Sequence, residues 1–217
     1  APVIGPGRHC KERFAGYASG YHNVMKTLSD AALYKLGQDI RRWAHDLGFD
    51  SIGISATDLP EAALALRKWL QQGWHGEMDF MDRHVQERTR PELLVPDTIR
   101  IISVRLGYWR ASGEGALKTL RDPEKAYIAR YALGRDYHRP MRRKLQKLAD
   151  QITESVGPFS YRAFTDSAPV MEKPLGQNAG LGWLGKNTNL IDPKTGSWFF
   201  LGELYTDLPL PVDLPHS

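Results

Sequence analysis

The sequence predicts a single α+β domain in which a mixed β-sheet is flanked by helices. Segments with the three-to-four periodicity of amphipathic helices alternate along the chain with short β-prone runs. The 217 residues suffice for one buried core, and 41% apolar with 25% charged content is ordinary for a globular protein. No apolar run of about 18 residues occurs, so we expect no membrane-spanning helix.

We divide the chain into three parts by composition. Residues 1–28 are interpreted as a flexible leader, residues 29–207 as the folded domain and residues 208–217 as an extended tail that is too rich in proline for a helix. Cys10 is the single cysteine, so the sequence predicts no internal disulfide and no metal site built on cysteines. Nothing in the sequence directs export, which makes a cytoplasmic location the default expectation.

The first half of the domain predicts two helices, each followed by a strand. The first helix runs over residues 29–47, with Gly48 at its end. Its apolar stripe consists of Leu33, Leu36, Ile40, Trp43 and Leu47. A short buried strand at 49–54 follows, and Asp58 then opens a helix that ends at Gly73, with Leu64, Leu66, Trp69 and Leu70 toward the core. Residues 98–108 predict a long strand.

The second half predicts a long helix, a strand, a short helix and a hairpin. The long helix carries an apolar stripe of Met141, Leu145, Leu148 and Ile152, and it stops before Gly157. Residues 161–165 return as a strand that ends at Asp166, and residues 172–179 are helical in pattern. Residues 188–191 and 197–204, joined by a turn at 192–196, give the signal of a β-hairpin.

Positive charge is concentrated in the middle of the chain. Residues 83–147 hold sixteen Lys/Arg against seven Asp/Glu, a local balance of +9 in a chain whose net charge is +4. Segregation of this kind indicates an anionic partner, with nucleic acid the leading candidate, and a solvated basic surface is the alternative. Arg142 and Arg143 lie near the start of the long helix, where cations oppose the helix dipole, so phosphate binding explains them better than helix stability does.

The glycine cluster from Gly180 to Gly185 has the spacing of a dinucleotide-binding motif and nearly that of a phosphate-binding loop. Both motifs must follow a strand and open a helix, whereas here a helical segment precedes the glycines and a strand follows them. We therefore reject both and retain a weaker hypothesis, that these glycines let the backbone approach a ligand closely. Asp166 is open to two interpretations, an N-cap of the following helix or a catalytic acid.

Several motifs in order resemble those of the bacterial epoxyqueuosine reductases. They are Tyr131-Ala-Leu-Gly-Arg-Asp-Tyr-His138, Asp166-Ser-Ala-Pro-Val-Met-Glu172, Ala179-Gly-Leu-Gly-Trp-Leu-Gly-Lys186 and Phe199-Phe-Leu-Gly-Glu-Leu204. The resemblance extends from about Leu33 to Pro215. It implies a cobalamin-binding, nitroreductase-like domain similar to that of reductive dehalogenases, and an oxidoreductase that converts epoxyqueuosine to queuosine in the tRNA anticodon loop.

The resemblance also implies roles for individual residues. Asp166 matches the family's proposed proton donor. Cobalamin-binding residues are expected at Tyr137, His138, Ser167, Ala168, Gly180, Gly182, Trp183, Gly185 and Lys186. Contacts with tRNA are expected at Arg130, Tyr131, Arg135, Asp136, Arg142 and Arg143. An external electron donor and a monomeric state complete these expectations.

One departure from the family qualifies the expected activity. Family members carry two [4Fe-4S] clusters in a ferredoxin-like region that follows the segment resembling residues 209–213, and this sequence contains no cysteine ligands for such clusters. The chain is therefore interpreted as truncated before that region. Two other functions stay open: a non-catalytic fragment that binds cobalamin or tRNA, and a flavin-dependent reductase.

Overall fold

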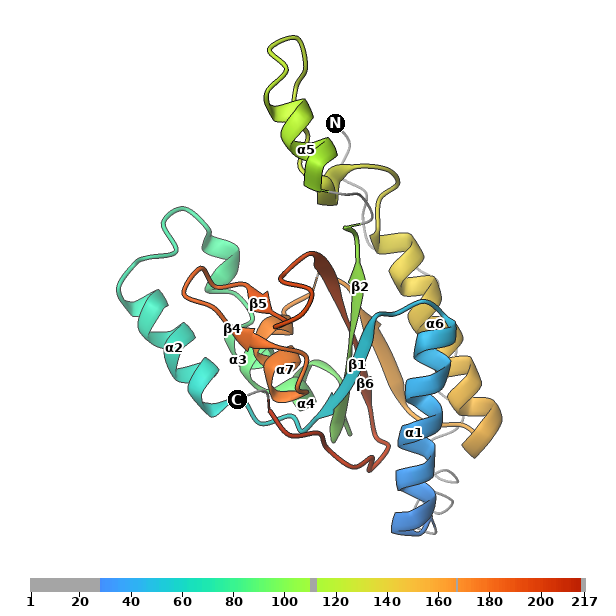
Figure 1. Ribbon diagram of the computed structural model, residues 1–217. Coiled ribbons are helices and arrows are strands. Elements are labelled where there is room, and N and C mark those ends of the chain that lie inside the picture. The colour runs from blue at the N-terminus through green and yellow to red at the C-terminus, as the bar shows by residue number, and fades with distance from the viewer. Residues whose placement is uncertain (1–27, 110–112, 167, 216–217) are drawn as a thin grey trace, which may run out of the picture.

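The structure is a computed structural model that describes residues 28–109, 113–166 and 168–215 (Figure 1). The expected leader at 1–28, with Cys10, lies almost wholly outside the described residues. The helices are α1 (Asp30–Asp46), α2 (Pro60–Gln71), η3 (Asp79–Met81), α3 (Val85–Thr89), α4 (Pro91–Leu94), α5 (Gly113–Leu120), η4 (Arg130–Ala132), α6 (His138–Val156) and α7 (Glu172–Asn178). The strands are β1 (Ser51–Ser55), β2 (Arg100–Gly107), β3 (Tyr161–Phe164), β4 (Trp183–Leu184), β5 (Leu190–Ile191) and β6 (Phe199–Thr206).

A four-stranded sheet in the order β1-β2-β6-β3 forms the centre of the domain. Each of its strand pairs is antiparallel, and so is the separate β4–β5 pair. The predicted α+β class is confirmed, but the predicted mixed sheet is wrong. Hydrophobic pattern identifies strands and says little about their relative direction, which depends on how the connecting segments cross the sheet.

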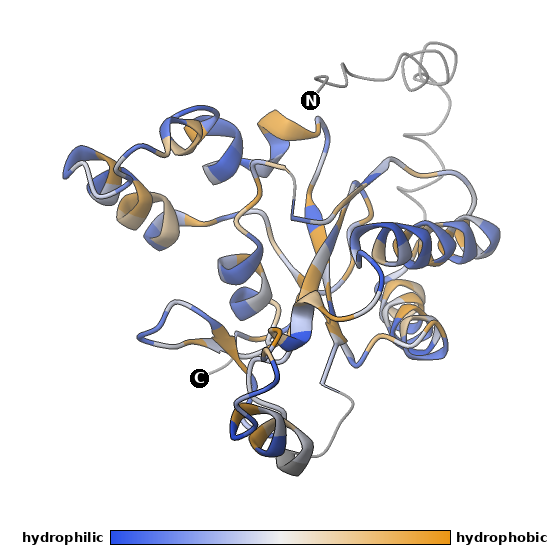
Figure 2. Cartoon of the chain, turned by 90° about the horizontal axis from the view of Figure 1, so that it is seen from above, coloured by the Kyte–Doolittle hydropathy of each residue, from blue (hydrophilic) through white to orange (hydrophobic). Residues whose placement is uncertain are grey.

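Helices α1 and α6 cover one face of the sheet and contact each other (Figure 1). The main core lies between this helix pair and the strands, and its fully buried members include Ile40, Ile54, Ile102, Val104, Leu145, Leu148 and Leu204. Ser29 caps α1 by accepting a hydrogen bond from the Ala32 N–H at 3.3 Å. Seen from above in Figure 2, the sheet separates this helix pair from the elements on its other side.

Helix α7 packs on the opposite face, against β1, β2 and β6. Its C-terminal end lies so close to β1 that a Cβ atom placed on Gly53 would stand 1.9 Å from the carbonyl oxygen of Ala179. A second core cluster, which includes Ile101, Phe164, Leu175 and Tyr205, fills this side. One end of this face of the sheet is therefore apolar. The lack of a side chain at Gly53 sets how closely α7 can approach β1.

Two local predictions in the first half are wrong. The N-cap of α2 is Leu59, which makes no side-chain capping bond, and Pro60 occupies the first helical turn in place of a cap from Asp58. Leu64 is 70% exposed, whereas Leu66 is buried as predicted. The described helices lack the combination of length and apolar character that a bilayer span requires.

The predicted hairpin is also wrong in its pairing. The β5 strand pairs with β4, while β6 lies between β2 and β3 in the main sheet. Only a bridge between Asp192 and Gly196 joins the two segments across the turn. Strand β2 pairs with β6 over its whole length and β3 pairs with its last four residues, so β6 makes its antiparallel ladders with these strands instead of with β5.

We predict that Gly53→Ala destabilises the domain by about 2 kcal/mol, because the new methyl group overlaps the Ala179 carbonyl and α7 must shift. Chemical denaturation measures the change. Gly115→Ala is the matched control, since a Cβ there meets nothing within 4 Å. Equal stability of the two variants would contradict the close packing of α7 on β1.

Candidate active site

The segment after β3 and the start of α6 meet at one end of the sheet. Asp166 follows β3 by two residues, and Tyr137 directly precedes α6. The Tyr137 hydroxyl donates a hydrogen bond to Asp166 Oδ2 at 3.0 Å, and the Tyr137 ring stacks on Phe200 of β6 with a centroid distance of 3.7 Å. Burial, followed by the hydrogen bond to Asp166, raises the pKa of the Tyr137 phenol, which keeps it protonated as a donor.

His138 lies between two carboxylates. Its Nδ1 is 2.5 Å from Asp136 Oδ1, and its Nε2 is 3.4 Å from Asp166 Oδ2. The hydrogen bond to His138 lowers the pKa of Asp136, so Asp136 is the ionised partner that favours a proton on Nδ1. This arrangement leaves Nε2 facing Asp166, and the three side chains form a polar chain Asp136–His138–Asp166.

The Asp166 backbone has a conformation that few residues adopt. Its φ is +57°, in the left-handed region, and its N–H donates to Glu172 Oε1 at 2.8 Å. The interpretation of Asp166 as a helix cap is wrong, because α7 begins at Glu172 with Met171 as its N-cap and no side-chain capping bond. The Asp166 side chain is 61% exposed, so its carboxyl faces the solvent beside Tyr137 and His138.

A hollow of about 390 Å³ lined by arginine and aromatic side chains opens next to Tyr137. We call it the arginine–tyrosine hollow; its lining includes Tyr108, Arg130, Tyr131, Leu133, Arg135, Tyr137 and Phe200. The Arg130 guanidinium also lies over the rings of Trp109 and Tyr127, at 5.2 and 5.9 Å. Predicted tRNA-contacting residues thus gather beside Asp166, while Arg142 and Arg143 stand exposed on α6 and do not line the hollow.

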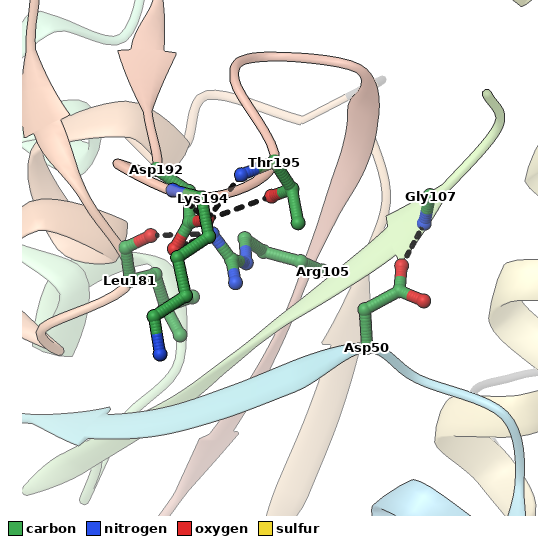
Figure 3. Close-up of polar contacts among 7 residues, drawn as sticks. All are labelled: Asp50, Arg105, Gly107, Leu181, Asp192, Lys194 and Thr195. Atoms are coloured by element: carbon green, nitrogen blue, oxygen red, sulfur yellow. Dashed lines mark hydrogen bonds and ion pairs between the residues drawn. The ribbon is translucent and has the colours of Figure 1, made fainter.

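Arg105 fastens the glycine-rich hairpin to the sheet (Figure 3). This side chain on β2 is 7% exposed, and its Nη1 contacts Asp192 Oδ2 at 2.9 Å and the Leu181 carbonyl at 2.8 Å. Burial acts to raise the pKa of Asp192, but hydrogen bonds from Thr195 and Arg105 outweigh it and bring the pKa to about 2. The β4–β5 hairpin is therefore held by a buried ion pair in addition to its own ladder.

Close contacts within the chain explain why glycine occupies three positions in and before this hairpin. A Cβ on Gly182 would lie 2.3 Å from the Ile191 carbonyl, one on Gly185 2.5 Å from Ile191 Cδ1, and one on Gly180 2.7 Å from the Leu214 carbonyl. Gly180 has a φ of +73° directly after α7, as expected for a residue that ends a helix. The close approach that the spacing predicts is real, but its partners are atoms of the same chain, namely backbone carbonyls at Gly180 and Gly182 and the Ile191 side chain at Gly185.

The exposed surface of the β4–β5 hairpin carries two large apolar side chains. Trp183 and Leu184 of β4 are 36% and 39% exposed, and Lys186 is exposed just beyond them. We call these three residues the β4 ledge. Among the other predicted cofactor residues, Ala168 packs partly buried against the second core cluster, and Ser167 lies outside the described residues. An exposed tryptophan and leucine on a tightly anchored strand suit a large, flat ligand.

Sequence reasoning missed Arg105, Phe200, Glu172 and Glu203 as contributors to this region. A signal for two of them was present, because Arg105 and Glu203 are charged residues inside otherwise apolar strands. Charged side chains are seldom buried without a partner, so such a position indicates a buried contact. Phe200 gave no signal, since an aromatic residue in a strand is ordinary.

A family model described as "Epoxyqueuosine reductase QueG, DUF1730" matches residues 88–167. The epoxyqueuosine reductase of Pseudomonas aeruginosa is 53% identical over 179 residues, covering 82% of this chain and 49% of that protein. That of Xanthomonas campestris is 54% identical over 176 residues, covering 81% and 50%. The chain spans about half the length of the curated relatives it matches.

Solved structures show the same fold. The epoxyqueuosine reductase of Streptococcus thermophilus matches with a TM-score of 0.72 and 26% identity, over 83% of this chain and 48% of that one. A catabolic reductive dehalogenase matches with a TM-score of 0.53 and 15% identity, over 85% of this chain and 21% of that one, which is a likeness of fold alone.

We predict that Asp192→Asn lowers the free energy of unfolding by about 3 kcal/mol at neutral pH, because Arg105 stays buried without its counter-ion. The pKa of Asp192 is depressed, so its contribution is present above the ordinary value of 3.8 and is lost as the pH falls through about 2. Denaturant unfolding at several pH values should show the two proteins converging in acid.

Lys194→Ala is the control for this substitution. Lys194 lies in the same turn, and only its backbone N–H contacts Asp192, so the variant keeps that hydrogen bond. A loss in Lys194→Ala as large as that in Asp192→Asn would show that the turn, and not the ion pair, fixes the hairpin.

Proposed function

Because the chain belongs to the epoxyqueuosine reductase family over the half of those proteins that it spans, we propose that it acts in the reduction of epoxyqueuosine to queuosine in tRNA. The observation that carries the proposal is the Asp166 carboxyl, held by Tyr137 and His138 at the open end of the sheet beside the arginine–tyrosine hollow. The relatives named as epoxyqueuosine reductases, at 53% and 54% identity, support the reaction class.

The reaction requires protons at a defined place. Removing the epoxide oxygen as water and leaving an alkene consumes two electrons and two protons. Asp166 is positioned to deliver a proton to the departing oxygen, because its carboxyl is exposed while its backbone is fixed. Tyr137 orients the carboxyl through Oδ2, and His138 can return a proton to it through Nε2 while Asp136 stabilises the charged ring.

The electron source in this proposal is cobalamin, as the family resemblance implies. Reduced cobalt supplies the electrons when the cofactor is bound. On this chain we assign Trp183, Leu184 and Lys186, the β4 ledge, to hold it, since these side chains are exposed and the hairpin beneath them is anchored by Arg105. The glycines contribute indirectly, by letting the hairpin pack tightly enough to present that ledge.

The arginine–tyrosine hollow is the proposed site for the RNA. Arg130 and Arg135 supply charge for phosphate groups, and the exposed Tyr131 ring offers a surface on which an unpaired base can stack. The hollow shares Tyr137 with the Asp166 site, so a nucleoside bound in it lies next to the proton donor. The net positive charge of residues 83–147 favours the approach of an anionic partner.

We predict that Asp166→Asn lowers epoxide reduction by at least about 100-fold, in line with the loss of a general acid. The assay follows conversion of epoxyqueuosine in an anticodon stem-loop by the cobalamin-loaded protein with a chemical reductant. Asparagine keeps the size of the side chain and tolerates a positive φ, so the fold is preserved.

Binding of the stem-loop and uptake of cobalamin by Asp166→Asn, followed by anisotropy and absorbance, are the controls and should match wild type. Unchanged turnover in the variant would remove Asp166 from the mechanism. Binding without turnover in the wild type would indicate a non-catalytic binding module, and a flavin spectrum in the purified protein would indicate a flavin-dependent reductase.

We further predict that the double substitution Arg130→Ala and Arg135→Ala weakens stem-loop binding at least about tenfold and reduces its dependence on salt, because two cations facing phosphates are removed. The double substitution Lys35→Ala and Arg42→Ala, which removes two exposed cations from α1, is the charge-matched control. Equal losses in both variants would mean that only net charge matters.

A further inference from the structure

Two glutamates meet beneath α7, on the face of the sheet away from α1 and α6. Glu203 belongs to the central strand β6 and is 0% exposed, paired across the ladder with Ser103 of β2 and Phe164 of β3. Glu172 is the first residue of α7 and is only partly exposed. The two carboxyl groups lie close enough for each to act on the pKa of the other. The mechanism described above uses neither of them.

Their contact requires a proton. Two ionised carboxylates accept hydrogen bonds and donate none, so a bond between them forms only when one of the two is protonated. Neither Glu203 oxygen has a donor from another group among the described residues, and no ion pair of the described chain includes Glu172 or Glu203. Burial, followed by the charge of the neighbouring glutamate, raises the pKa of Glu203 well above its ordinary value, and burial also raises that of Glu172.

The surroundings of the pair favour the protonated form. Asp166 adds further negative charge near Glu172, and Lys173 is the cation that acts on it in the opposite direction. Burial raises the pKa of the Tyr205 phenol, and the charges of Glu203 and Glu172 raise it further, so Tyr205 lies near both glutamates. The buried hydroxyls of Ser103 and Tyr205 have no hydrogen-bond partner among the described groups and carry no charge to offset an anion. One shared proton is therefore the state that the environment supports.

The pair is connected to the candidate acid through the backbone. Glu172 Oε1, the oxygen on the Asp166 side, accepts the Asp166 N–H at 2.8 Å. That bond links two residues six positions apart and helps to hold Asp166 at a φ of +57°. Aspartate tolerates this conformation better than most residues other than glycine, but the conformation still costs free energy that a local contact can offset. Glu172 makes such a contact with the backbone from which the Asp166 carboxyl projects.

We propose that the Glu172–Glu203 pair, joined by one proton, is the positioning device for Asp166. Glu203, on β6, fixes the position of the Glu172 carboxyl through the shared proton. Glu172 in turn accepts the hydrogen bond from the Asp166 N–H. Neither glutamate touches the substrate in this scheme. The proposal rests on the proposed function of Asp166 as proton donor and adds two residues on which that function depends.

Amide hydrogen exchange at Asp166, measured by NMR without cofactor or substrate, tests the contact. We expect Glu172→Ala to exchange this amide at least about tenfold faster relative to the wild-type protection factor, because the acceptor is gone. Glu172→Gln should restore protection, since its amide oxygen accepts the same bond and its NH₂ can donate to Glu203. Glu154→Ala, the same substitution at an exposed glutamate on α6, should match wild type.

The shared proton predicts how Asp166 protection responds to pH. In the wild type the protection factor should fall as the pH rises and the pair loses its proton, because two facing anions separate. In Glu203→Gln the side-chain NH₂ donates at every pH, so this fall should disappear. A wild-type protection factor that is independent of pH, or one that falls equally in Glu203→Gln, would overturn the shared proton. Unchanged exchange in Glu172→Ala would overturn the contact.

Turnover of the Glu172 variants then distinguishes a positioning role of Glu172 from a purely structural one. We expect Glu172→Ala to reduce epoxide reduction at least about tenfold with unchanged affinity for the stem-loop, and Glu172→Gln to recover it. If the amide responds as expected and turnover does not, Glu172 is only a structural residue and the proposal fails. The proposed function would still stand in that case, because it is judged by Asp166→Asn.

Discussion

The central strand β6 carries two incompatible environments on its two faces, and the architecture depends on keeping them apart. Gly202 and Leu204 face α6 and the main core, where a Cβ on Gly202 would lie 3.2 Å from Met141 and Leu145 atoms. Glu203 and Tyr205 face α7 and are buried, and no ion pair among the described residues includes Glu203. Burial and the charge of the nearby Glu172 both raise the pKa of Glu203, which favours a neutral carboxyl on this face.

The candidate site is assembled from segments that are far apart in the sequence and is rigid only where they meet. Tyr137 comes from the start of α6, Phe200 from β6 and Asp166 from the link between β3 and α7. Stacking of Tyr137 on Phe200 fixes the phenol, and the phenol fixes the carboxyl. The hairpin that bears the β4 ledge is held separately, by Arg105 and Asp192. Two independent anchors thus support the Asp166 site and the β4 ledge, the two parts of the proposed reaction site.

The sequence predicts the positions of helices and strands well, but it predicts poorly which strands pair. Apolar periodicity locates α1, α6, β1 and β2, because burial of one face leaves a regular pattern. The same pattern cannot show which strands pair, so the predicted hairpin fails. Asp166 and Tyr137 are found through motifs, and Glu203 stands out as a charged residue in an apolar strand. Its neighbour Glu172 is 31 positions away and depends on how the start of α7 lies over β6, so the local pattern does not identify it.

The left-handed backbone conformation of Asp166 restricts which residue types can occupy this position more than the need for an acid does. A φ of +57° is tolerated by glycine, asparagine and aspartate, and strongly disfavoured by β-branched or bulky side chains. Of the tolerated residues only aspartate is an acid. Glutamate, the usual conservative substitution for aspartate, has a longer side chain and adopts a positive φ less readily. The position is therefore constrained twice, by the acid that the proposed mechanism requires and by the backbone conformation of the turn.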